Sequence, residues 1–517
     1  MEEYVLILGA GLMQRPSIEA AKELGYKALV IDANPNAVCV PFADCFMQID
    51  LKDKEAIADL AMGMGKNLAG IFTAGTDFSA SVSYAAEKCG LPCHTYEAAL
   101  NASNKVLMRQ CFKEHNVPSP DFFEADKDYL AKVEQGKADI KFPKVVKPVD
   151  NMGARGCRLV RNEEEFLPAL REAIKYSRTG KAIVEDYMDG LEFSIDALVF
   201  RGKVIITGFA DRHIYYSPYF VEVGHSMPSR IPDGIKAEIV DCFKKGIKAL
   251  GLTTGVAKGD IKYILGKGPM IGEIAARLSG GYMSGWTFPY SSDLNLTKEA
   301  LKIALGKIPE ISILPEVTSI RHSHERAFIS IPGKIKAIYG QENAIASPFV
   351  RDLFFRVKAG DTVDFPRNNV EKCGNVISVS EDRELALHGA ESAVAEIVLR
   401  LEPNNKATDD FLAGVELPDE KGFPCGAFGL IDFEIYRLNE EVKKSPVIKE
   451  NASIAEVLPE ALKERMCRDW NYRSIEKTVA LFDRICPVHK EFDAEKFWKV
   501  LIRGGIQGIL YYADSLE

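Results

Sequence analysis

The sequence predicts an α/β protein of several domains, and three observations support this prediction. The chain has 517 residues, enough for several domains of about 100–200 residues each. At its N-terminus, an apolar run at residues 4–8 leads through a glycine turn into an amphipathic helix, and a second apolar run follows at 27–32, which is the pattern of a βαβ unit. Later in the chain, short β-branched runs are joined by glycine-rich turns, which indicates antiparallel strands.

Composition narrows the class of protein and of partner. Hydrophobic residues make up 47% of the chain and charged residues 27%, which is ordinary for a globular protein. The formal net charge of −9 argues against a nucleic-acid or membrane partner. No apolar run approaches the roughly 20 residues that span a bilayer, and the acidic N-terminus is unlike a signal peptide. The 11 scattered cysteines suit a reducing compartment, so we expect a cytoplasmic protein.

The N-terminal pattern is expected to form a Rossmann-like α/β domain over residues 1–104. After the first βαβ unit, strand and helix patterns continue to alternate, at residues 45–49, 53–62, 70–73 and 77–89. The turn at Gly9 and Gly11 lacks the third glycine of a dinucleotide fingerprint. We therefore do not expect Asp32, at the end of the second strand, to hold the ribose of NAD.

Residues 255–285 are expected to form a β-hairpin that carries a pair of carboxylates. A turn centred between Gly266 and Lys267 places Asp260 directly opposite Glu273. Carboxylates about 5 Å apart repel each other unless a cation holds them. Mg²⁺ uses few protein carboxylates together with substrate phosphates. The pair therefore predicts a site for Mg²⁺ or Mn²⁺, with a solvent-facing charged hairpin as the alternative.

Basic residues and glycines earlier in the chain suit a triphosphate. Lys147 ends a strand predicted at 142–147, and the loop that follows, at 150–157, contains Gly153 and Gly156. Backbone N–H groups approach phosphate oxygens closely only where no Cβ intervenes, and lysine adds a point charge. Lys105 lies on a helix predicted at 104–115, whose basic residues could equally form a solvated face.

Two acidic residues and one histidine are further candidates for ligand contacts. Glu185, in a strand predicted at 182–187, begins a segment that can present backbone groups to a purine. Glu192 follows at a distance suited to ribose hydroxyls. His225 lies in a stretch, residues 219–230, that we expect to be irregular. A lone histidine is more often structural, and a role as a ligand is the alternative.

The order of these parts resembles the ATP-grasp superfamily over about residues 1–400. The segments F-V-E-V-G-H-S-M-P-S-R and E-I-A-A-R-L-S-G-G are most similar to amino-acid ligases of the bacilysin-synthetase type. Those enzymes join a carboxylate to an amine through an acyl-phosphate. The resemblance implies a Rossmann-like pre-ATP-grasp domain and then a two-lobed ATP-grasp domain of α+β type. Residues 410–517 match no known family, and their own helical patterns predict a mainly helical C-terminal extension.

The resemblance also implies a role for each matching residue. For the nucleotide these are phosphate contacts from Lys105 and Lys147, a mobile lid at Gly153 and Gly156, adenine contacts from Glu185, Asp186 and Met188, and a ribose contact from Glu192. For metal and substrate they are Asp260 and Glu273 on Mg²⁺, Arg277 on the acyl-phosphate and the tetrahedral intermediate, and His225 and Gly281 in the substrate pocket. Arg277 and Lys147 would be the catalytic residues.

Two positions depart from the family pattern. Many ATP-grasp enzymes have a metal-binding asparagine two residues after the second carboxylate, where this chain has Ala275. A bulky residue can follow the arginine by four positions in the amino-acid ligases, where this chain has Gly281. The acyl substrate is then larger, or Tyr282 or Trp286 restricts the pocket instead.

These expectations give a domain plan. We expect a pre-ATP-grasp domain at 1–104, an ATP-grasp domain at 105–330 with a lid lobe at about 118–190, a closing lobe at 331–401, and a helical extension at 402–517. For the extension we favour a packing role over capping the active site, dimerisation or binding a partner.

The predicted function is an ADP-producing, ATP-dependent ligase that joins a carboxylate to an amine, with an amino acid as one substrate. The expected cofactors are ATP and Mg²⁺ or Mn²⁺, the partners are small-molecule carboxylates and amines, and the chain is compatible with a homodimer. The alternatives are an enzyme that activates bicarbonate, like a carboxylase or carbamoyl-phosphate synthase, and a nucleotide-binding regulatory subunit without turnover.

Overall fold

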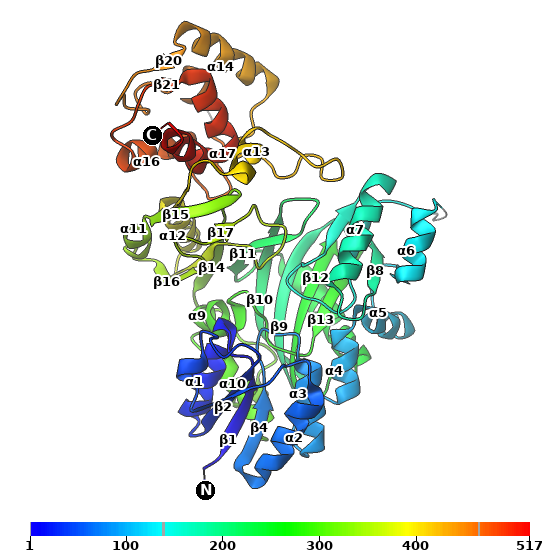
Figure 1. The fold of residues 1–517 in the computed structure, drawn as a ribbon. Coiled ribbons are helices and arrows are strands. Elements are labelled where there is room, and N and C mark those ends of the chain that lie inside the picture. Colours follow the sequence, from blue (N-terminus) through cyan, green and yellow to red (C-terminus); the bar gives the residue numbers. More distant parts are fainter. Residues whose placement is uncertain (1, 137–139, 464–465, 517) are drawn as a thin grey trace. The chain divides into compact units, whose positions relative to one another are not determined.

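A computed structural model describes residues 2–136, 140–463 and 466–516, and the chain divides into two compact units (Figure 1). Unit 1 comprises residues 1–214, 224–324 and 381–383. Unit 2 comprises residues 215–223, 325–380 and 384–517.

Unit 1 begins with a parallel four-stranded sheet in the order β3-β2-β1-β4. Its strands are β1 (Tyr4–Leu8), β2 (Lys27–Asp32), β3 (Cys45–Gln48) and β4 (Leu68–Phe72). Its helices are α1 (Arg15–Glu23), α2 (Lys54–Met64), α3 (Ser79–Lys88) and α4 (Tyr96–Ser103), all in blue in Figure 1. The predicted βαβ start is confirmed. Helix α4, which Thr95 caps, was not predicted.

The carboxylate of Asp32 serves the glycine turn after β1. One of its oxygens accepts a hydrogen bond from the Ala10 N–H at 2.8 Å, and the other accepts from the Asn34 N–H at 2.8 Å. The carboxylate therefore fixes the backbone at the carboxyl end of this sheet.

A second, four-stranded sheet of unit 1 has the order β5-β8-β6-β7. Its strands are β5 (Phe122–Ala125), β6 (Lys144–Pro148), β7 (Arg158–Val160) and β8 (Ala182–Asp186), and its helices are α6 (Lys127–Glu134) and α7 (Glu163–Tyr176). Val146 and Val184 pack against Phe166 and Leu170 of α7 in its core. The glycine-containing loop lies between β6 and β7, as predicted.

The central antiparallel strands of unit 1 run in the order β13-β12-β9-β10. They are β9 (Leu191–Phe200), β10 (Lys203–Tyr215), β12 (Gly255–Ile264) and β13 (Gly268–Ala275). Phe193, Ile195 and Ile261 face one side, where they share a core with α5 (Lys105–Glu114) and α8 (Asp233–Ala249). Because side chains alternate along a strand, Ser194, Asp196 and Asp260 face the other side. Helices α9 (Phe288–Ser292) and α10 (Leu296–Ala304) follow the hairpin.

The expectation of an irregular segment at 219–230 was wrong in its centre. Residues Val221–Met227 form strand β11, and all of them are buried. Polar residues within V-E-V-G-H-S-M obscured the strand, because burial on both faces removes the alternation that marks a half-exposed strand. Strand β11 and strand β14 (His322–Phe328) each contribute residues to both units.

The part of unit 2 before residue 402 contains two sets of paired strands among the described residues. Strand β16 (Val350–Phe355) pairs with β18 (Gly374–Ser380), and β15 (Gly333–Tyr339) pairs with β17 (Thr362–Val363) and β19 (Val398–Leu401). The helices here are α11 (Gln341–Ile345) and α12 (Arg383–Glu396). The helix predicted at 383–399 therefore ends early, because its last residues form β19.

Residues 402–516 of unit 2 are mainly helical, as predicted. The helices are α13 (Lys406–Leu412), α14 (Asp432–Lys444), α15 (Glu460–Lys463), α16 (Ile475–Ile485) and α17 (Ala494–Asp514), and β20 (Val447–Ile448) pairs with β21 (Phe492–Asp493). Of the helix predicted at 459–466, residues 464–465 lie outside the described residues. Helix α17 kinks at Gly505, whose φ is 56°.

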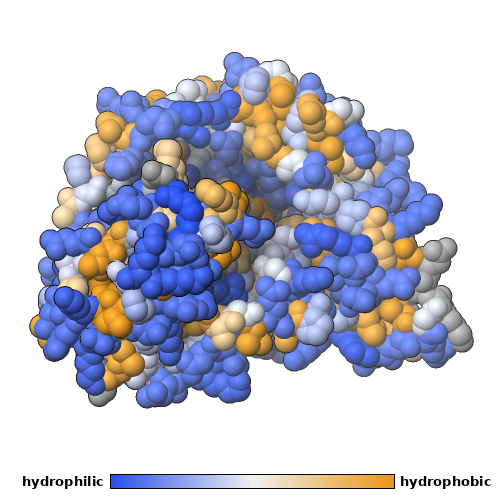
Figure 2. Space-filling model, turned by 90° about the horizontal axis from the view of Figure 1, so that it is seen from above, coloured by the Kyte–Doolittle hydropathy of each residue, from blue (hydrophilic) through white to orange (hydrophobic). Residues whose placement is uncertain are grey.

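The surface agrees with the composition. On the face in Figure 2, hydrophilic side chains (blue) cover most of the surface and apolar side chains (orange) form separate patches. Across the described ranges, no helix has both the length and the apolar character needed to cross a bilayer.

Candidate active site

The hairpin β12–β13 places Asp260 directly opposite Glu273, as predicted. The predicted pairing beside the turn was one residue out of register, since Ile264 pairs with Gly268 and the turn centres on Gly266 rather than between Gly266 and Lys267. A bulge corrects the register: Ile261 pairs with Ile271, and the next pair is Asp260 with Glu273. Gly272 is the extra residue. Its carbonyl accepts a hydrogen bond from Arg109 Nη2 at 2.6 Å.

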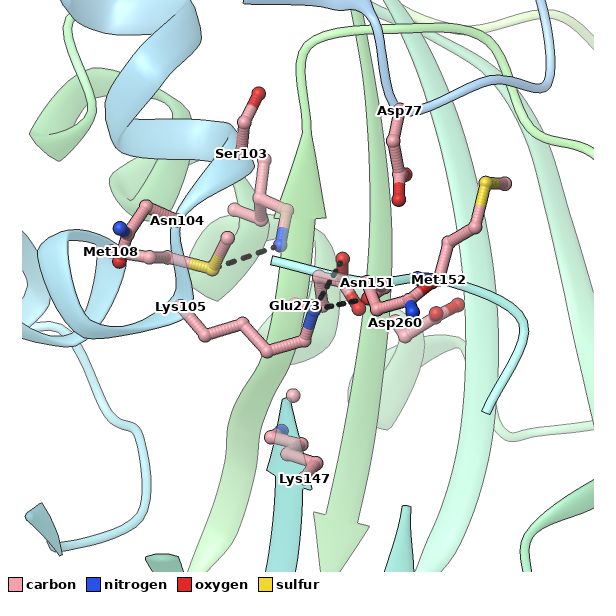
Figure 3. Close-up of polar contacts among 12 residues, drawn as sticks. Asp77, Ser103, Asn104, Lys105, Met108, Lys147, Asn151, Met152, Asp260 and Glu273 are labelled. Carbon is pink, nitrogen blue, oxygen red and sulfur yellow. Dashed lines mark hydrogen bonds and ion pairs between the residues drawn. The ribbon is translucent and has the colours of Figure 1, made fainter. Parts of the chain in front are cut away.

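Lys105 connects this hairpin to the glycine loop. Its Nζ lies 3.7 Å from Glu273 Oε1 and donates a hydrogen bond to the Asn151 carbonyl at 2.8 Å (Figure 3). Asn104, the residue before it, caps α5 through its side chain. The helix start therefore aims a buried ammonium at the carboxylate pair, where a phosphate oxygen could share it.

Three donors surround the Asp260 carboxylate. Ser194 Oγ donates to Oδ1 at 2.8 Å, while Arg212 Nη1 lies 3.0 Å from Oδ2, where Lys258 Nζ also binds. Burial alone would raise the pKa of Asp260, but Arg212 and Lys258 outweigh burial and hold the pKa at about 2.

Glu273 is also ionised. Burial opposes the charged form, but Lys105 and Lys258 outweigh burial and lower the pKa of Glu273. Both carboxylates are therefore negative at neutral pH.

Glu185 is engaged in a buried ion cluster. Its carboxylate lies 2.6 Å from Lys147 Nζ and 2.8 Å from Arg109 Nε. Burial raises the pKa of Glu185, but Arg109 and Lys147 more than reverse this, so the net shift is downward. Both carboxylate oxygens thus bind cations, and the adenine contact that the family resemblance implied for Glu185 stays a prediction.

The other residues expected around adenine and ribose lie along β8, β9 and the segment between them. Asp186 pairs with Lys144 across β8 and β6, and its side chain is half exposed. The Met188 carbonyl accepts from Lys262 Nζ at 3.1 Å. The Glu192 carboxylate binds Arg212 and lies 3.3 Å from Lys262 Nζ. Glu192 thus shares Arg212 with Asp260, which links the expected ribose and metal positions.

The glycine loop has the backbone conformation that glycine favours. Gly153 and Gly156 have φ angles of 69° and 65°. A Cβ on Gly156 would lie 2.9 Å from the Tyr176 ring. Asp150 anchors the start of the loop by accepting hydrogen bonds from Ser177 Oγ and from the N–H groups of residues 178 and 179. These contacts leave the tip of the loop to approach a ligand.

Arg277 is buried, and within the described part of the chain its Nε has no hydrogen-bond partner. Its Nη1 donates to the Leu278 carbonyl at 3.1 Å. Gly281, which follows in the same loop, has a φ of 60°, and the next residue, Tyr282, packs edge-on against Trp286 at 5.6 Å. The guanidinium thus retains capacity to bind an anion.

The first domain contributes Asp77, which sequence reasoning missed. Ala74 forms a parallel bridge with Leu278, and the Gly75 N–H donates to the Leu278 carbonyl at 3.2 Å. This contact brings Asp77 toward the carboxylate hairpin (Figure 3). Burial raises the pKa of Asp77, and Arg277 is the strongest of the charges that oppose the rise. The Asp77 carboxylate lies 3.7 Å from Arg178 Nη2, and the charge of Arg277 also acts on it.

His225 lies on the face of the sheet that carries the carboxylates. The next residue, Ser226, bonds to His213 Nε2 at 2.9 Å. His213 neighbours Arg212, which contacts Asp260. Because side chains alternate along each strand, His213 and Ser226 share one face, and Arg212 and His225 share the other. His225 itself is fully buried.

The residues present fit a hard divalent cation. In the described ranges, no group of three or more His, Cys, Asp and Glu side chains could hold a metal ion. The site therefore offers two carboxylates, Asp260 and Glu273, which suits Mg²⁺ or Mn²⁺ when phosphate oxygens and water complete the coordination.

Two parts of the chain match known domain families. Residues 140–284 match the family model of the ATP-grasp domain, and residues 327–402 match L-amino acid ligase C-terminal domain 2. The chain therefore contains an ATP-grasp domain. The predicted ATP-grasp ligase, with its α/β fold and its similarity to amino-acid ligases, is confirmed.

Relatives of this ATP-grasp chain include a bacterial and a human protein. An uncharacterized protein of Sinorhizobium fredii is 25% identical over 411 residues, which cover 77% of this chain and 83% of that protein. Human carnosine synthase 1 is 25% identical over 340 residues, which cover 60% of this chain. The match spans only 41% of carnosine synthase 1.

Solved structures share the fold. L-amino acid ligase from Bacillus licheniformis superposes with a TM-score of 0.67 at 20% identity, covering 78% of this ATP-grasp chain and 99% of that one. Phosphoribosylglycinamide synthetase from Anaerococcus prevotii gives a TM-score of 0.61 at 23% identity, covering 78% and 100%.

Proposed function

We propose that this ATP-grasp protein is an ADP-producing ligase that forms an amide or peptide bond between a carboxylate and an amine, with an amino acid as one substrate. The observation that carries the proposal is the Asp260–Glu273 pair, which lies beside Lys105. The match of residues 327–402 to an L-amino acid ligase domain and the relationship to carnosine synthase favour an amine as the second substrate.

The nucleotide would lie between the glycine loop and the hairpin. Lys105 and Lys147 would contact the phosphates, and the loop with Gly153 and Gly156 would close over them. Asp260 and Glu273 would hold Mg²⁺ or Mn²⁺, which, when bound, neutralises charge on the phosphate oxygens. Glu185 holds Lys147 in place by an ion pair of 2.6 Å, so the ammonium needs little reorganisation when the phosphates arrive.

The reaction would proceed in two displacements. An oxygen of the substrate carboxylate attacks the γ-phosphorus of ATP, and the bond to ADP breaks. The amine nitrogen then attacks the acyl carbon, loses a proton, and inorganic phosphate leaves with the C–O bonding pair. Arg277 would stabilise the negative charge that develops on the acyl oxygen. The closed glycine loop would exclude water, which otherwise hydrolyses the acyl-phosphate.

The neighbourhood of Arg277 and Asp77 suits an amino acid. Arg277 offers a guanidinium to the reacting carboxylate, and Asp77 offers a carboxylate to an ammonium group. Burial raises the pKa of Asp77 in the free protein. A bound ammonium would favour the charged form of Asp77, so the two groups would stabilise each other.

A phosphate-release screen tests the proposal. Purified protein receives ATP and Mg²⁺ with single amino acids, pairs of amino acids, small acids, or bicarbonate, and mass spectrometry follows ADP and amide products. We expect release that needs both a carboxylate and an amine. Release that depends on bicarbonate would favour a carboxylase, and no turnover would favour a regulatory subunit.

Variants of two glutamates provide a matched comparison in this screen. Glu273→Ala removes one of the paired carboxylates and should abolish ATP turnover while leaving the fold intact. Glu238→Ala, at an exposed position on α8, should retain turnover. Near-normal turnover in Glu273→Ala would refute the metal assignment.

A further inference from the structure

Lys258 lies among the site residues but has no role in the proposed reaction. It is two residues before Asp260 on β12, so both side chains are on one face of the sheet. Across the sheet, Lys258 is flanked by Ala275 on β13 and Asp196 on β9. Its side chain is only 9% exposed, and Ala275 opposite it has no polar atom. The ammonium therefore lies inside the site rather than on the solvent side.

Lys258 helps to satisfy one of the two metal-binding carboxylates. Its Nζ binds Asp260 Oδ2, the oxygen that Arg212 Nη1 approaches at 3.0 Å. The other oxygen, Oδ1, accepts from Ser194 at 2.8 Å. Both oxygens of Asp260 thus have protein donors, and two of these donors carry positive charge.

Glu273 is in a different position. Within the described residues, its closest cation is Lys105, at 3.7 Å, and its side chain is 31% exposed. Lys258 acts on Glu273 through its charge, and Asp260 is the carboxylate that it binds directly. Of the paired carboxylates, Glu273 is therefore the one open to a divalent cation.

We propose that the Lys258 ammonium is a built-in cation that takes the place of a second divalent ion. The chain then binds one Mg²⁺ or Mn²⁺ with the nucleotide, and Glu273 is its principal protein ligand. A second divalent ion on Asp260 would have to displace the ammonium or lie against it, and like charges in a buried site repel strongly. This inference rests on the proposed function, because it concerns the same metal and nucleotide.

Counting bound Mn²⁺ tests the inference without an activity assay. The full chain, saturated with the non-hydrolysable ATP analogue AMP-PNP, is titrated with MnCl₂, and the electron paramagnetic resonance signal of free Mn²⁺ gives the number bound. We expect one Mn²⁺ per chain. Two Mn²⁺ per wild-type chain would overturn the inference and leave the proposed function standing, whereas no Mn²⁺ bound with the nucleotide would overturn both.

Substitutions at position 258 separate charge from shape. Lys258→Met keeps the length of the side chain and removes the ammonium, so the number of Mn²⁺ ions bound per chain should rise from one to two. Lys258→Arg keeps the charge and should stay at one. A count of one in Lys258→Met, with a native circular-dichroism spectrum, would overturn the inference. If Lys258→Met does not fold, Lys258→Gln carries the same expectation.

Discussion

At the scale of single residues, Arg277 differs from the other cations of the site. Lys147, Lys258 and Arg212 are each bound to a carboxylate, whereas Arg277 Nε has no hydrogen-bond partner in the described part of the chain. A buried guanidinium with unused donor capacity is suited to charge that appears only during the reaction. We therefore propose that Arg277 serves the chemical step rather than nucleotide binding.

Arg277→Ala should retain ATP binding and lose product. Loss of one donor to a developing oxyanion lowers kcat by about 100- to 1000-fold. Calorimetry with ADP and mass spectrometry of the amide product would measure the two properties separately. Arg171→Ala, on the exposed side of α7, is the matched control and should leave both unchanged. An unchanged rate of ligation in Arg277→Ala would remove its proposed role.

Asp77→Asn should weaken binding of the amino acid and leave the KM for ATP unchanged. A hydrogen bond to a charged group contributes about 1.5–3 kcal/mol, so the KM for the amino acid should rise by about 10- to 100-fold. Steady-state kinetics at varied amino acid and at varied ATP distinguish the two effects. A variant in which both KM values stay within twofold of wild type would show that Asp77 does not bind the ammonium.

Asp196 should make stability depend on pH. Burial raises its pKa from 3.8 to about 6, although the Ser279 hydroxyl and N–H donate to it. Between these values the folded state holds more protons than the unfolded state, so stability falls as the pH rises through this window. At neutral pH, a shift of this size lowers the free energy of unfolding by about 3 kcal/mol relative to the same carboxyl group with an unshifted pKa.

Asp196→Asn cannot titrate, and its comparison with wild type isolates this effect. Melting temperatures of the two proteins should be measured from pH 4 to pH 7. Relative to wild type, the variant should gain stability as the pH rises, and most of the gain should appear below about pH 6.5. A difference that does not change with pH would contradict the assignment.

The site residues that could be predicted from the sequence were those that lie close to one another along the chain, within a single structural element. Asp260 and Glu273 belong to one hairpin, and Lys147 and Gly153 belong to one strand and its loop. Asp77 and Arg212 could not be found in this way, because their neighbours come from other elements through long-range strand pairing and loop packing. Glu185 shows the same limit: its partner Arg109 lies on a helix 76 residues earlier in the chain.

At the scale of elements, the hairpin has the predicted pairing of Asp260 with Glu273, but this pairing depends on a bulge that was not predicted. A regular hairpin with the observed turn would place Asp260 opposite Gly272, and the bulge brings Glu273 there instead. The residues of a turn do not reveal a bulge farther along the strands. The pairing of Asp260 with Glu273 therefore could not be derived from the observed position of the turn alone. The close packing of the hairpin on α8 then holds the strands in place.

Gly259→Ala should disturb this packing. A Cβ at Gly259 would lie 2.6 Å from the Phe243 ring of α8, so the strand next to Asp260 would have to move. Overpacking of this kind costs about 1–3 kcal/mol. We expect a lower melting temperature together with weaker binding of Mn²⁺ and nucleotide. Gly234→Ala, on α8 with no atom within 4 Å of its Cβ, is the control, and an equal loss in both variants would contradict the explanation.

At the scale of the whole molecule, the extension after residue 401 completes the core of unit 2. Arg473 donates through Nε to the Ala395 carbonyl at 2.9 Å and also binds the Ile397 carbonyl. Gln507 Nε2 donates to the Leu399 carbonyl at 2.9 Å, and its Oε1 accepts from the Ile331 N–H at 3.1 Å. These buried side chains satisfy backbone groups of the preceding segment, which supports the packing role favoured from the sequence.

The last prediction concerns this dependence of one segment on the other. Gln507→Ala should leave the Leu399 carbonyl and the Ile331 N–H without their partners, and each unsatisfied buried group costs about 1–3 kcal/mol. The melting transition of unit 2 should therefore fall by several degrees, while nucleotide binding at the hairpin of unit 1 remains. Gln341→Ala, at an exposed position on α11, is the control and should melt like wild type. A chain that ends at residue 404 should lose folded unit 2 altogether, because the deletion removes Arg473 and Gln507 together with the helices α16 and α17 that carry them. Hydrogen exchange of residues 395–401 would decide the matter: native protection in the shortened chain would show that the segment folds without the extension.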